Sequence, residues 1–171
     1  MSDKTEEYFD IVDENDNVIG KASRSQCHGD NSLAHRVVHV LVFNSKGQLF
    51  LQKRSKNKFI QPGKWDTSVG GHLDSGETYD QAVKREMKEE LGIIAPVKHV
   101  YNYWMCNDIE TEYVQTYICI YDGNIEFDPD EIDEGRFWTK SEIESNLGKD
   151  IFTPNFEEEY QRYLDWINSV R

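Results

Sequence analysis

One segment of this 171-residue chain, residues 71–93, strongly limits the folds that the chain can adopt. It reads GHLDSGETYDQAVKREMKEELGI, in which Val83, Met87 and Leu91 recur at intervals of four residues. At about 100° per residue, these three side chains form one apolar stripe along a helix. Gly92 follows the stripe and suits the left-handed conformation in which many helices end. The segment therefore predicts an amphipathic helix that ends at Gly92.

Three glutamates share one face of the same helix. Glu86, Glu89 and Glu90 stand at positions i, i+3 and i+4, where neighbouring Cβ atoms lie roughly 5–6 Å apart. Like charges at this spacing repel one another, and a divalent cation would turn that repulsion into a binding site. Carboxylate oxygens suit Mg²⁺ or Mn²⁺. A solvated acidic helix face is the alternative, but the glycine-rich loop that begins at Gly70 favours the metal site.

The spacing of residues 71–93 resembles the Nudix box, G-x5-E-x7-R-E-U-x-E-E-x-G-U, in which U is a bulky apolar residue. All nine specified positions are filled, by Gly71, Glu77, Arg85, Glu86, Met87, Glu89, Glu90, Gly92 and Ile93. The resemblance implies hydrolysis of a nucleoside diphosphate, or of another diphosphate, linked to a further group. It also implies an α/β fold, a Nudix-type α/β/α sandwich around a mixed β-sheet. Glu77 and Arg85 would pair and hold the loop against the helix, which is a structural role.

The resemblance implies chemical roles for the glutamates as well. Glu86, Glu89 and Glu90 would bind the metal together with the Gly71 carbonyl, and the same three carboxylates are the catalytic candidates. A bound metal lowers the pKa of coordinated water and neutralises charge on phosphoryl oxygens. Glu86 is the leading candidate for the base that orients or deprotonates the attacking water. Which carboxylate acts as the base is left open by the sequence.

A second resemblance covers much of residues 8–156, which are similar to the type I isopentenyl-diphosphate isomerases, Nudix-fold enzymes that shift a double bond. It depends on the segments DENDNVIG, VFNSKGQLFLQKRS, PGKWDTSVGGH and ETEY. In that family a second metal is held by three histidines and two glutamates. The matching residues here are His28, His35, His72, Glu110 and Glu112. Imidazole with carboxylate suits Zn²⁺ or Mn²⁺, while surface histidines and a solvent-facing strand are the alternatives.

The chain departs from the isomerases in two respects. The catalytic cysteine of the isomerases precedes a Gly-His pair, whereas here Gly70 precedes Gly71 and His72. The isomerases also usually carry a degraded Nudix box, and the box of this chain is complete. We therefore expect hydrolysis of a phosphoanhydride. The alternatives are an isopentenyl-diphosphate isomerase and a non-catalytic metabolite-binding Nudix module.

The balance of charge limits the partners. A formal net charge of −13 and a pI near 4.7 argue against nucleic acid and anionic membranes. Positive charge is concentrated in residues 53–64, directly before the glycine-rich loop. In the isomerases, the residues that match Arg24, Arg54 and Lys58 contact the diphosphate, and a forked guanidinium such as that of Arg54 fits phosphate oxygens. A small-molecule diphosphate is the expected partner, and a solvated basic loop is the alternative for these cations.

Aromatic residues bear on the rest of the substrate. Trp65, Tyr101, Tyr103 and Trp104 could stack on a nucleobase, a contact worth about 1–3 kcal/mol. Packing within the core or the sheet is the more common role of aromatic residues on strands and is the favoured interpretation, with stacking as the alternative. Trp65 is the strongest stacking candidate, because it lies in the loop that leads to Gly70.

The cysteines and the lack of apolar runs indicate the compartment. Cys27, Cys106 and Cys119 are odd in number and show no paired spacing, so we expect free thiols in a reducing cytosol. The sequence shows no leader peptide and no run of about 20 apolar residues, and we therefore expect a cytoplasmic protein. Aromatic residues in the final helix are consistent either with a homodimer surface or with packing over the sheet.

The remaining segments alternate between strand and helix patterns within one expected domain, residues 1–171, which has a small N-terminal hairpin extension and a C-terminal helix. The expected strands are residues 8–12, 18–22, 37–43, 48–52, 97–105, 113–121 and 134–138. The expected helices after the box are residues 140–146 and 156–170. Residues 56–64 are a polar loop that we expect at the rim of the substrate site.

Overall fold

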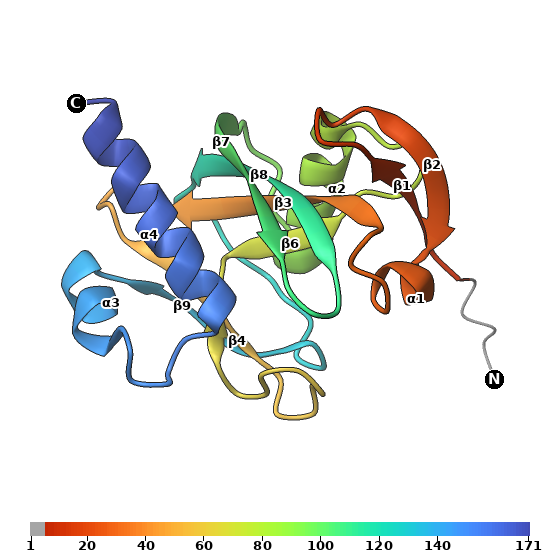
Figure 1. Cartoon of the computed structure of the whole chain (residues 1–171). Coiled ribbons are helices and arrows are strands. Elements are labelled where there is room, and N and C mark those ends of the chain that lie inside the picture. The colour runs from red at the N-terminus through yellow and green to blue at the C-terminus, as the bar shows by residue number, and fades with distance from the viewer. Residues whose placement is uncertain (1–5) are drawn as a thin grey trace.

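A computed structural model describes residues 6–171 of the chain (Figure 1). Its strands are β1 (Tyr8–Val12), β2 (Val18–Ser23), β3 (Ala34–Phe43), β4 (Leu49–Arg54), β5 (Trp65–Asp66), β6 (Val69–His72), β7 (Lys98–Cys106), β8 (Thr111–Ile120) and β9 (Ile132–Trp138). Its helices are α1 (Arg24–Cys27), α2 (Tyr79–Leu91), α3 (Lys140–Asn146) and α4 (Pro154–Ser169).

Strand β3 lies at the centre of the sheet, because it pairs along both of its edges. One edge runs parallel to β8 over the whole length of β3. The other edge is antiparallel to β6, where Val37 lies opposite His72 and His39 lies opposite Gly70. The sheet is therefore mixed, as the sequence predicts.

The other strands extend the sheet around this centre. β7 continues it beyond β8, and β4 pairs with both β5 and β9. The hairpin of β1 and β2 joins it where Ile11 lies opposite His35. This hairpin was predicted as an N-terminal extension, and it lies next to the end of β3 from which His35 projects.

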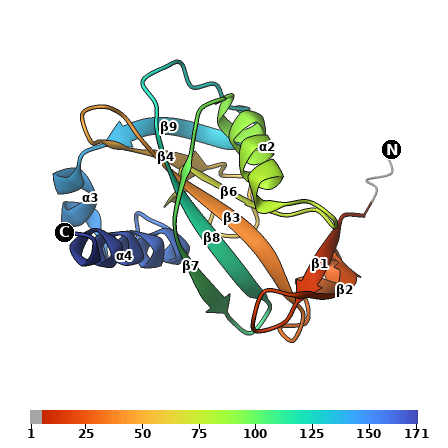
Figure 2. The ribbon, with the colours of Figure 1, turned by 90° about the horizontal axis from the view of Figure 1, so that it is seen from above.

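Two helices cover opposite faces of β3 and β8 (Figure 2). Val38, Val40 and Val42 project from β3 into one buried cluster with the apolar stripe of α2. Leu41 projects to the other face and belongs to a second buried cluster with Phe156 of α4. Burying one such side chain contributes about 1.5–3 kcal/mol, so the alternation along β3 holds both helices. The result is the predicted α/β/α sandwich.

The predicted strands and helices are confirmed with small shifts at their ends, the largest being the start of β3, at residue 34 and not at residue 37. Helix α4 begins at Pro154, two residues before the predicted start, because Thr153 caps it by accepting the Phe156 N–H at 3.1 Å. The short elements α1, β5 and β6 were not predicted, since two to four residues are too few for a periodic pattern.

The aromatic residues at the start of α4 pack over the sheet. Phe156 is fully buried and Tyr160 is nearly so, both within the cluster that contains Leu41. These two residues are therefore core residues. Within residues 6–171, no helix is both long and apolar enough to cross a membrane.

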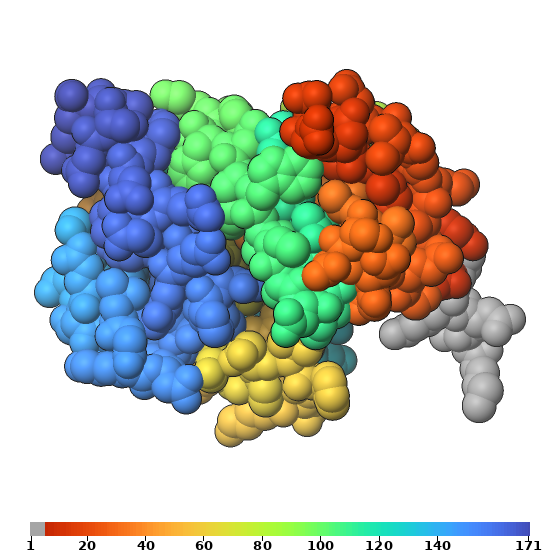
Figure 3. Space-filling view, in the orientation of Figure 1, coloured from red at the N-terminus to blue at the C-terminus, as the bar shows by residue number. Residues whose placement is uncertain are grey.

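The predicted polar loop connects β4 to β5. Figure 3 shows this part of the chain, in yellow, as a projection at the lower edge of the molecule. The loop carries the fully solvated side chain of Phe59 at 98% exposure. It is tied back to the sheet by Arg54, whose Nε donates to the Ile60 carbonyl at 3.0 Å.

We expect the packing of α2 against the sheet to stabilise the fold. Met87 is only 1% exposed, so Met87→Ala should lower the free energy of unfolding by about 2–5 kcal/mol through lost burial and a cavity. Lys88 is the exposed neighbour on the same helix, and Lys88→Ala should change the free energy of unfolding by less than about 0.5 kcal/mol. Urea unfolding of both variants measures this, and equal effects would contradict the assigned face of the helix.

Candidate active site

Local hydrogen bonds fix both ends of α2. The Thr78 hydroxyl accepts the Gln81 N–H at 3.2 Å, and the Gln81 side chain accepts the Thr78 N–H at 3.0 Å. This reciprocal capping box satisfies two backbone donors that the helix itself leaves free. At the other end, Gly92 has φ 65° and donates its N–H to the Lys88 carbonyl. These caps fix which way the three box glutamates face.

Arg85 joins the preceding loop to this helix. Its guanidinium donates two hydrogen bonds to the Glu77 carboxylate, both at 2.8 Å, and one to the His72 carbonyl at 3.0 Å. It also contacts Glu86 at 2.7 Å and Glu89 at 3.2 Å. The Arg85 guanidinium lowers the pKa of the Glu77 carboxyl below its ordinary value. The pairing is the one expected for a structural role of Glu77 and Arg85.

Two of the box glutamates face the glycines of β6. A Cβ atom added to Gly71 would overlap the Glu86 carboxyl, so only glycine allows this close approach. Glu90 accepts the Gly70 N–H at 3.0 Å. Burial raises the pKa of Glu86, and burial together with the nearby Glu86 carboxylate raises the pKa of Glu90 to about 8. Two hard carboxylates that repel each other beside a glycine backbone fit a divalent cation such as Mg²⁺ or Mn²⁺.

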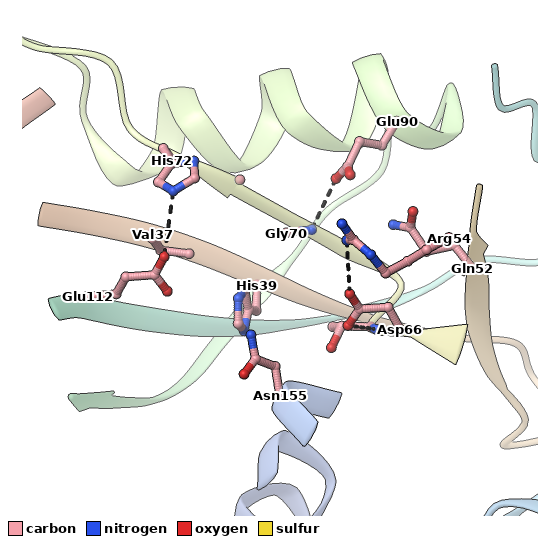
Figure 4. A pocket seen from close by; sticks show the side chains of 12 residues that line it. Val37, His39, Gln52, Arg54, Asp66, Gly70, His72, Glu90, Glu112 and Asn155 are labelled. Atoms are coloured by element: carbon pink, nitrogen blue, oxygen red, sulfur yellow. Dashed lines mark hydrogen bonds and ion pairs between the residues drawn. The ribbon is translucent and has the colours of Figure 1, made fainter. Parts of the chain in front are cut away.

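Glu90 opens into a cavity of about 210 Å³, here called the main cavity (Figure 4). Figure 4 shows Glu90 reaching toward Gly70 on one side and His72 facing Glu112 on the other, with His39 between them. The lining comes from both sheet and helices. The lining residues are Val37, His39, Gln52, Arg54, Asp66, Thr67, Gly70, Gly71, His72, Glu90, Glu112 and Asn155.

A second cavity of about 220 Å³, the side cavity, shares Gln52, Arg54 and Glu90 with the main cavity. Glu89 and Lys58 line the side cavity alone. The exposed Glu89 thus lies at the rim, separated from the main cavity. Lys58 forms an ion pair with Glu131, which also lines the side cavity. Arg54 contacts Asp66 at 3.5 Å and is the predicted diphosphate residue that lines both cavities.

The five residues of the predicted second metal site lie together. Four of them, His28, His35, His72 and Glu110, each offer one ligand atom, and these four atoms all lie within 4.8 Å of one another. Glu112 approaches His35 at 3.7 Å and His72 at 3.5 Å. His35 is fully buried, and both of its ring nitrogens lack a hydrogen-bond partner within the described residues. Unpartnered buried imidazole nitrogens beside carboxylates fit a metal of the zinc type.

The ionisation of this cluster reflects its crowding. Burial, with the neighbouring His72, lowers the pKa of His28 to about 4. Burial, with the neighbouring Glu112, raises the pKa of Glu110 to about 7. Burial alone would raise the pKa of Glu112 as well, but His35 and His72 hold it well below its ordinary value. Neutral imidazole and ionised carboxylate are the forms that bind metal.

The N-terminal hairpin supports this cluster. Phe9 of β1 is fully buried and stacks on His72, with ring centroids 4.8 Å apart and an interplanar angle of 9°. It also stacks on His35 at 5.2 Å. Helix α1 places His28 at its C-terminal end. The extension thus both orients and supplies imidazole groups.

One predicted diphosphate residue lies apart from the other two. Arg24 is exposed, contacts Glu7 at 2.7 Å, and lines neither cavity. The capping box of α1, in which Ser23 accepts the Gln26 N–H, places Arg24 at the first position of that helix. Its side chain therefore lies on the side of the histidine cluster, where its charge lowers the pKa of His28 after the larger effects of burial and His72.

The prediction that Trp65 stacks on a nucleobase is wrong. Trp65 is 8% exposed and packs at right angles to Trp138, with ring centroids 5.1 Å apart. Its backbone belongs to β5, which was not predicted, and so its side chain points into the core and lines neither cavity. Tyr103 is also buried. Trp104 stays 39% exposed but already stacks on Tyr113 at 4.6 Å.

Six residues that line the main cavity were missed from the sequence: Val37, His39, Gln52, Asp66, Thr67 and Asn155. A signal existed for His39, because it alternates with His35 and Val37 on one face of an otherwise apolar strand. Asp66 and Asn155 come from β5 and from the first turn of α4, whose starts the apolar pattern did not locate.

Comparison with known proteins agrees with this geometry. The family model described as the NUDIX domain matches residues 33–159, which include β3, the box helix and most of the lining of both cavities. The chain belongs to the Nudix family. It is accordingly a Nudix-type hydrolase of diphosphate-type small molecules.

Relatives in this family carry two kinds of name. The chain is 34% identical over 150 residues to an uncharacterised Nudix hydrolase of Yersinia pestis, covering 87% of this chain and 81% of the relative. It is 31% identical over 173 residues to isopentenyl-diphosphate Delta-isomerase 2 of Photorhabdus laumondii, covering 94% and 97%. The crystal structure of DR0079 from Deinococcus radiodurans superposes with a TM-score of 0.78 at 27% identity, covering 91% of this chain and 98% of that one.

The Glu77–Arg85 pair should contribute stability that depends on pH. Because the folded pKa of Glu77 is depressed, its contribution is present above the ordinary pKa of 4.5 and is lost as the pH falls through the folded value. At neutral pH, Glu77→Gln should lower the free energy of unfolding by about 1–3 kcal/mol, and this deficit should shrink in acid. Denaturant unfolding from pH 7 to pH 3 measures it. Asp80→Asn, which breaks the exposed Lys84–Asp80 pair, is the control and should change little.

Proposed function

We propose that this Nudix protein hydrolyses a phosphoanhydride in a nucleoside diphosphate-linked or other diphosphate substrate, in a reaction that depends on Mg²⁺ or Mn²⁺. The observation that carries the proposal is the close approach of Glu86 and Glu90 to Gly71 and Gly70, at the edge of a cavity that Arg54 also lines. Carboxylates, a bare backbone and a guanidinium at one cavity match the needs of a metal-bound phosphate.

The metal would be held by Glu86, Glu89 and Glu90 with the Gly71 carbonyl. When bound, it supplies an activated water and neutralises charge on the phosphoryl oxygens. Arg85 keeps two of these carboxylates in place by contacting Glu86 and Glu89.

The side chains around the metal would divide the remaining work. Glu86 is the leading candidate to orient or deprotonate the attacking water, because it lies against Gly71 and Arg85 fixes its direction. Arg54 is placed to bind phosphate oxygens from the wall shared by both cavities. Lys58 lies beyond it and suits the distal part of an anionic substrate.

Isopentenyl-diphosphate isomerisation is the second candidate. The gathering of His28, His35, His72, Glu110 and Glu112, and the names of some relatives, favour it. Against it stands Gly70, because no described cysteine lines the main cavity to move a proton at carbon. The five-residue cluster is equally compatible with hydrolysis, to which a second metal would contribute charge. A metabolite-binding module without activity is disfavoured by the complete box.

Removal of one box carboxylate should separate these functions. Glu90→Gln removes a metal ligand, so metal-dependent phosphate release should fall at least about 100-fold while the protein stays folded. Phosphate release is measured with a panel of candidate substrates. These are nucleoside di- and triphosphates, dinucleotide and sugar diphosphates, and isopentenyl diphosphate. Glu14→Gln, at an exposed turn, is the control. Conversion of isopentenyl diphosphate to its isomer, with no phosphate released from any compound, would overturn the proposal.

Metal content tests the second site. We expect stoichiometric Zn or Mn in the purified protein, and its loss when His28, His35 and His72 are together replaced by Asn. Elemental analysis of both proteins, with circular dichroism to verify folding, gives the result. A wild-type protein that binds neither metal on titration would show that the cluster is not a metal site.

A further inference from the structure

His39 lines the main cavity beside Gly70, the position that the isomerase resemblance assigns to a catalytic cysteine. It lies directly opposite Gly70 in the pairing of β3 with β6. A Cβ atom added to Gly70 would lie 3.2 Å from Cδ2 and 3.6 Å from Nε2 of the imidazole. A side chain at position 70 and the imidazole of His39 therefore compete for one space. Glycine at position 70 leaves room for the imidazole of His39.

The Nδ1 edge of His39 faces away from Gly70 into a buried polar cluster. Nδ1 lies 3.3 Å from the Tyr103 hydroxyl and 3.7 Å from Oε1 of Glu159. Glu159 belongs to α4 and is completely buried, and its Oε1 accepts the Thr116 hydroxyl at 2.7 Å. A buried carboxylate is costly unless a positive group or hydrogen-bond donors lie beside it, and His39 is the basic side chain nearest to it.

The charges of this pair support each other. Burial by itself would lower the pKa of His39, but the Glu159 carboxylate raises it above its ordinary value. Burial by itself would raise the pKa of Glu159, but His39 lowers it. The imidazolium form is therefore favoured, and in that form both ring nitrogens are donors.

The Nε2 edge of His39 is the free edge. Among residues 6–171 it has no hydrogen-bond partner, although the side chain lines the main cavity. Figure 4 shows the ring between Glu112 and Asp66, above Asn155. Asn155 belongs to the first turn of α4. The N-terminus of this helix, which is the positive end of its dipole, therefore also lies at this region. A donor held rigidly at one edge and free at the other is arranged to bind an anion.

We propose that His39 contacts the substrate in the main cavity, donating a hydrogen bond from Nε2 to a phosphate oxygen while Glu159 and Tyr103 hold Nδ1. This inference rests on the proposed diphosphate chemistry and adds a residue that binds phosphate beside Gly70. It assigns the wall around Gly70 to the phosphates of the substrate. A buried ion pair with a purely structural role is the competing explanation, and it predicts effects on stability alone.

Two substitutions at His39 distinguish these explanations. In His39→Asn, the amide lies where Nδ1 was and keeps the contact with Glu159, but no donor remains at the position of Nε2. Gln is longer and can place its amide near the position of Nε2. The exposed His99 on β7 provides the matched control, His99→Asn. The probe is methylenediphosphonate, a diphosphate analogue with a P–C–P bridge that cannot be hydrolysed, with Mg²⁺ present.

Calorimetric titration measures the binding of this probe, and circular dichroism verifies that each variant is folded. We expect His39→Asn to weaken binding about tenfold, the effect of one hydrogen bond to a charged group. His39→Gln should bind more tightly than His39→Asn, and His99→Asn should match the wild type. Three results would each overturn the inference. They are wild-type affinity for the probe in His39→Asn, equal losses of affinity in both folded His39 variants, and no binding of the probe by the wild-type protein.

Phosphate release from the substrate panel keeps this test separate from that of the proposed function. If Glu90→Gln abolishes release and folded His39→Asn lowers kcat/KM by about 100-fold, both proposals are supported. If Glu90→Gln abolishes release while His39→Asn is unaffected, hydrolysis stands and the role of His39 is refuted. If no compound releases phosphate but the probe binds in the expected order, hydrolysis fails while the phosphate contact stands.

Discussion

The alternation of side chains along β3 is the constraint on which the rest of the molecule depends. One face of the strand carries Val38, Val40 and Val42, which anchor α2 and so determine where the box carboxylates lie. The other face carries His35 and His39 among apolar neighbours. A shift of one residue in the pairing would exchange these faces, sending imidazoles under α2 and valines into the cavity. The fold and the chemistry are therefore set by a single register.

Most of the Nudix fold, and the central part of the site, could be predicted from sequence, because both depend on local periodicity. The stripe of Val83, Met87 and Leu91 fixes the phase of α2, and that phase brings Glu86 and Glu90 to β6. The gathering of His28, His35 and His72 followed only from family resemblance, since these residues come from a helix end and two different strands.

What could not be predicted depends on contacts between distant segments. Trp65 looked like a loop residue because β5 has only two residues, and its burial depends on Trp138, far along the chain. The contact of Arg24 with Glu7 depends on the capping of a four-residue helix, which is too short for a periodic pattern to reveal. The relation between His39 and Gly70 is visible only when β3 and β6 are paired. Sequence periodicity carries no information about such pairings.

The position of β6 has a consequence for how the two proposed metal sites would behave together. Gly71, whose carbonyl is a proposed ligand of the first metal, is followed directly by His72, a proposed ligand of the second. Arg85 binds the His72 carbonyl while it contacts Glu86. An ion at either centre would restrain the same short stretch of backbone. The two sites are then thermodynamically linked. If one ion changes the affinity for the other by some factor, the second ion changes the affinity for the first by the same factor. Two cofactors of different chemistry would thus behave as one cooperative unit.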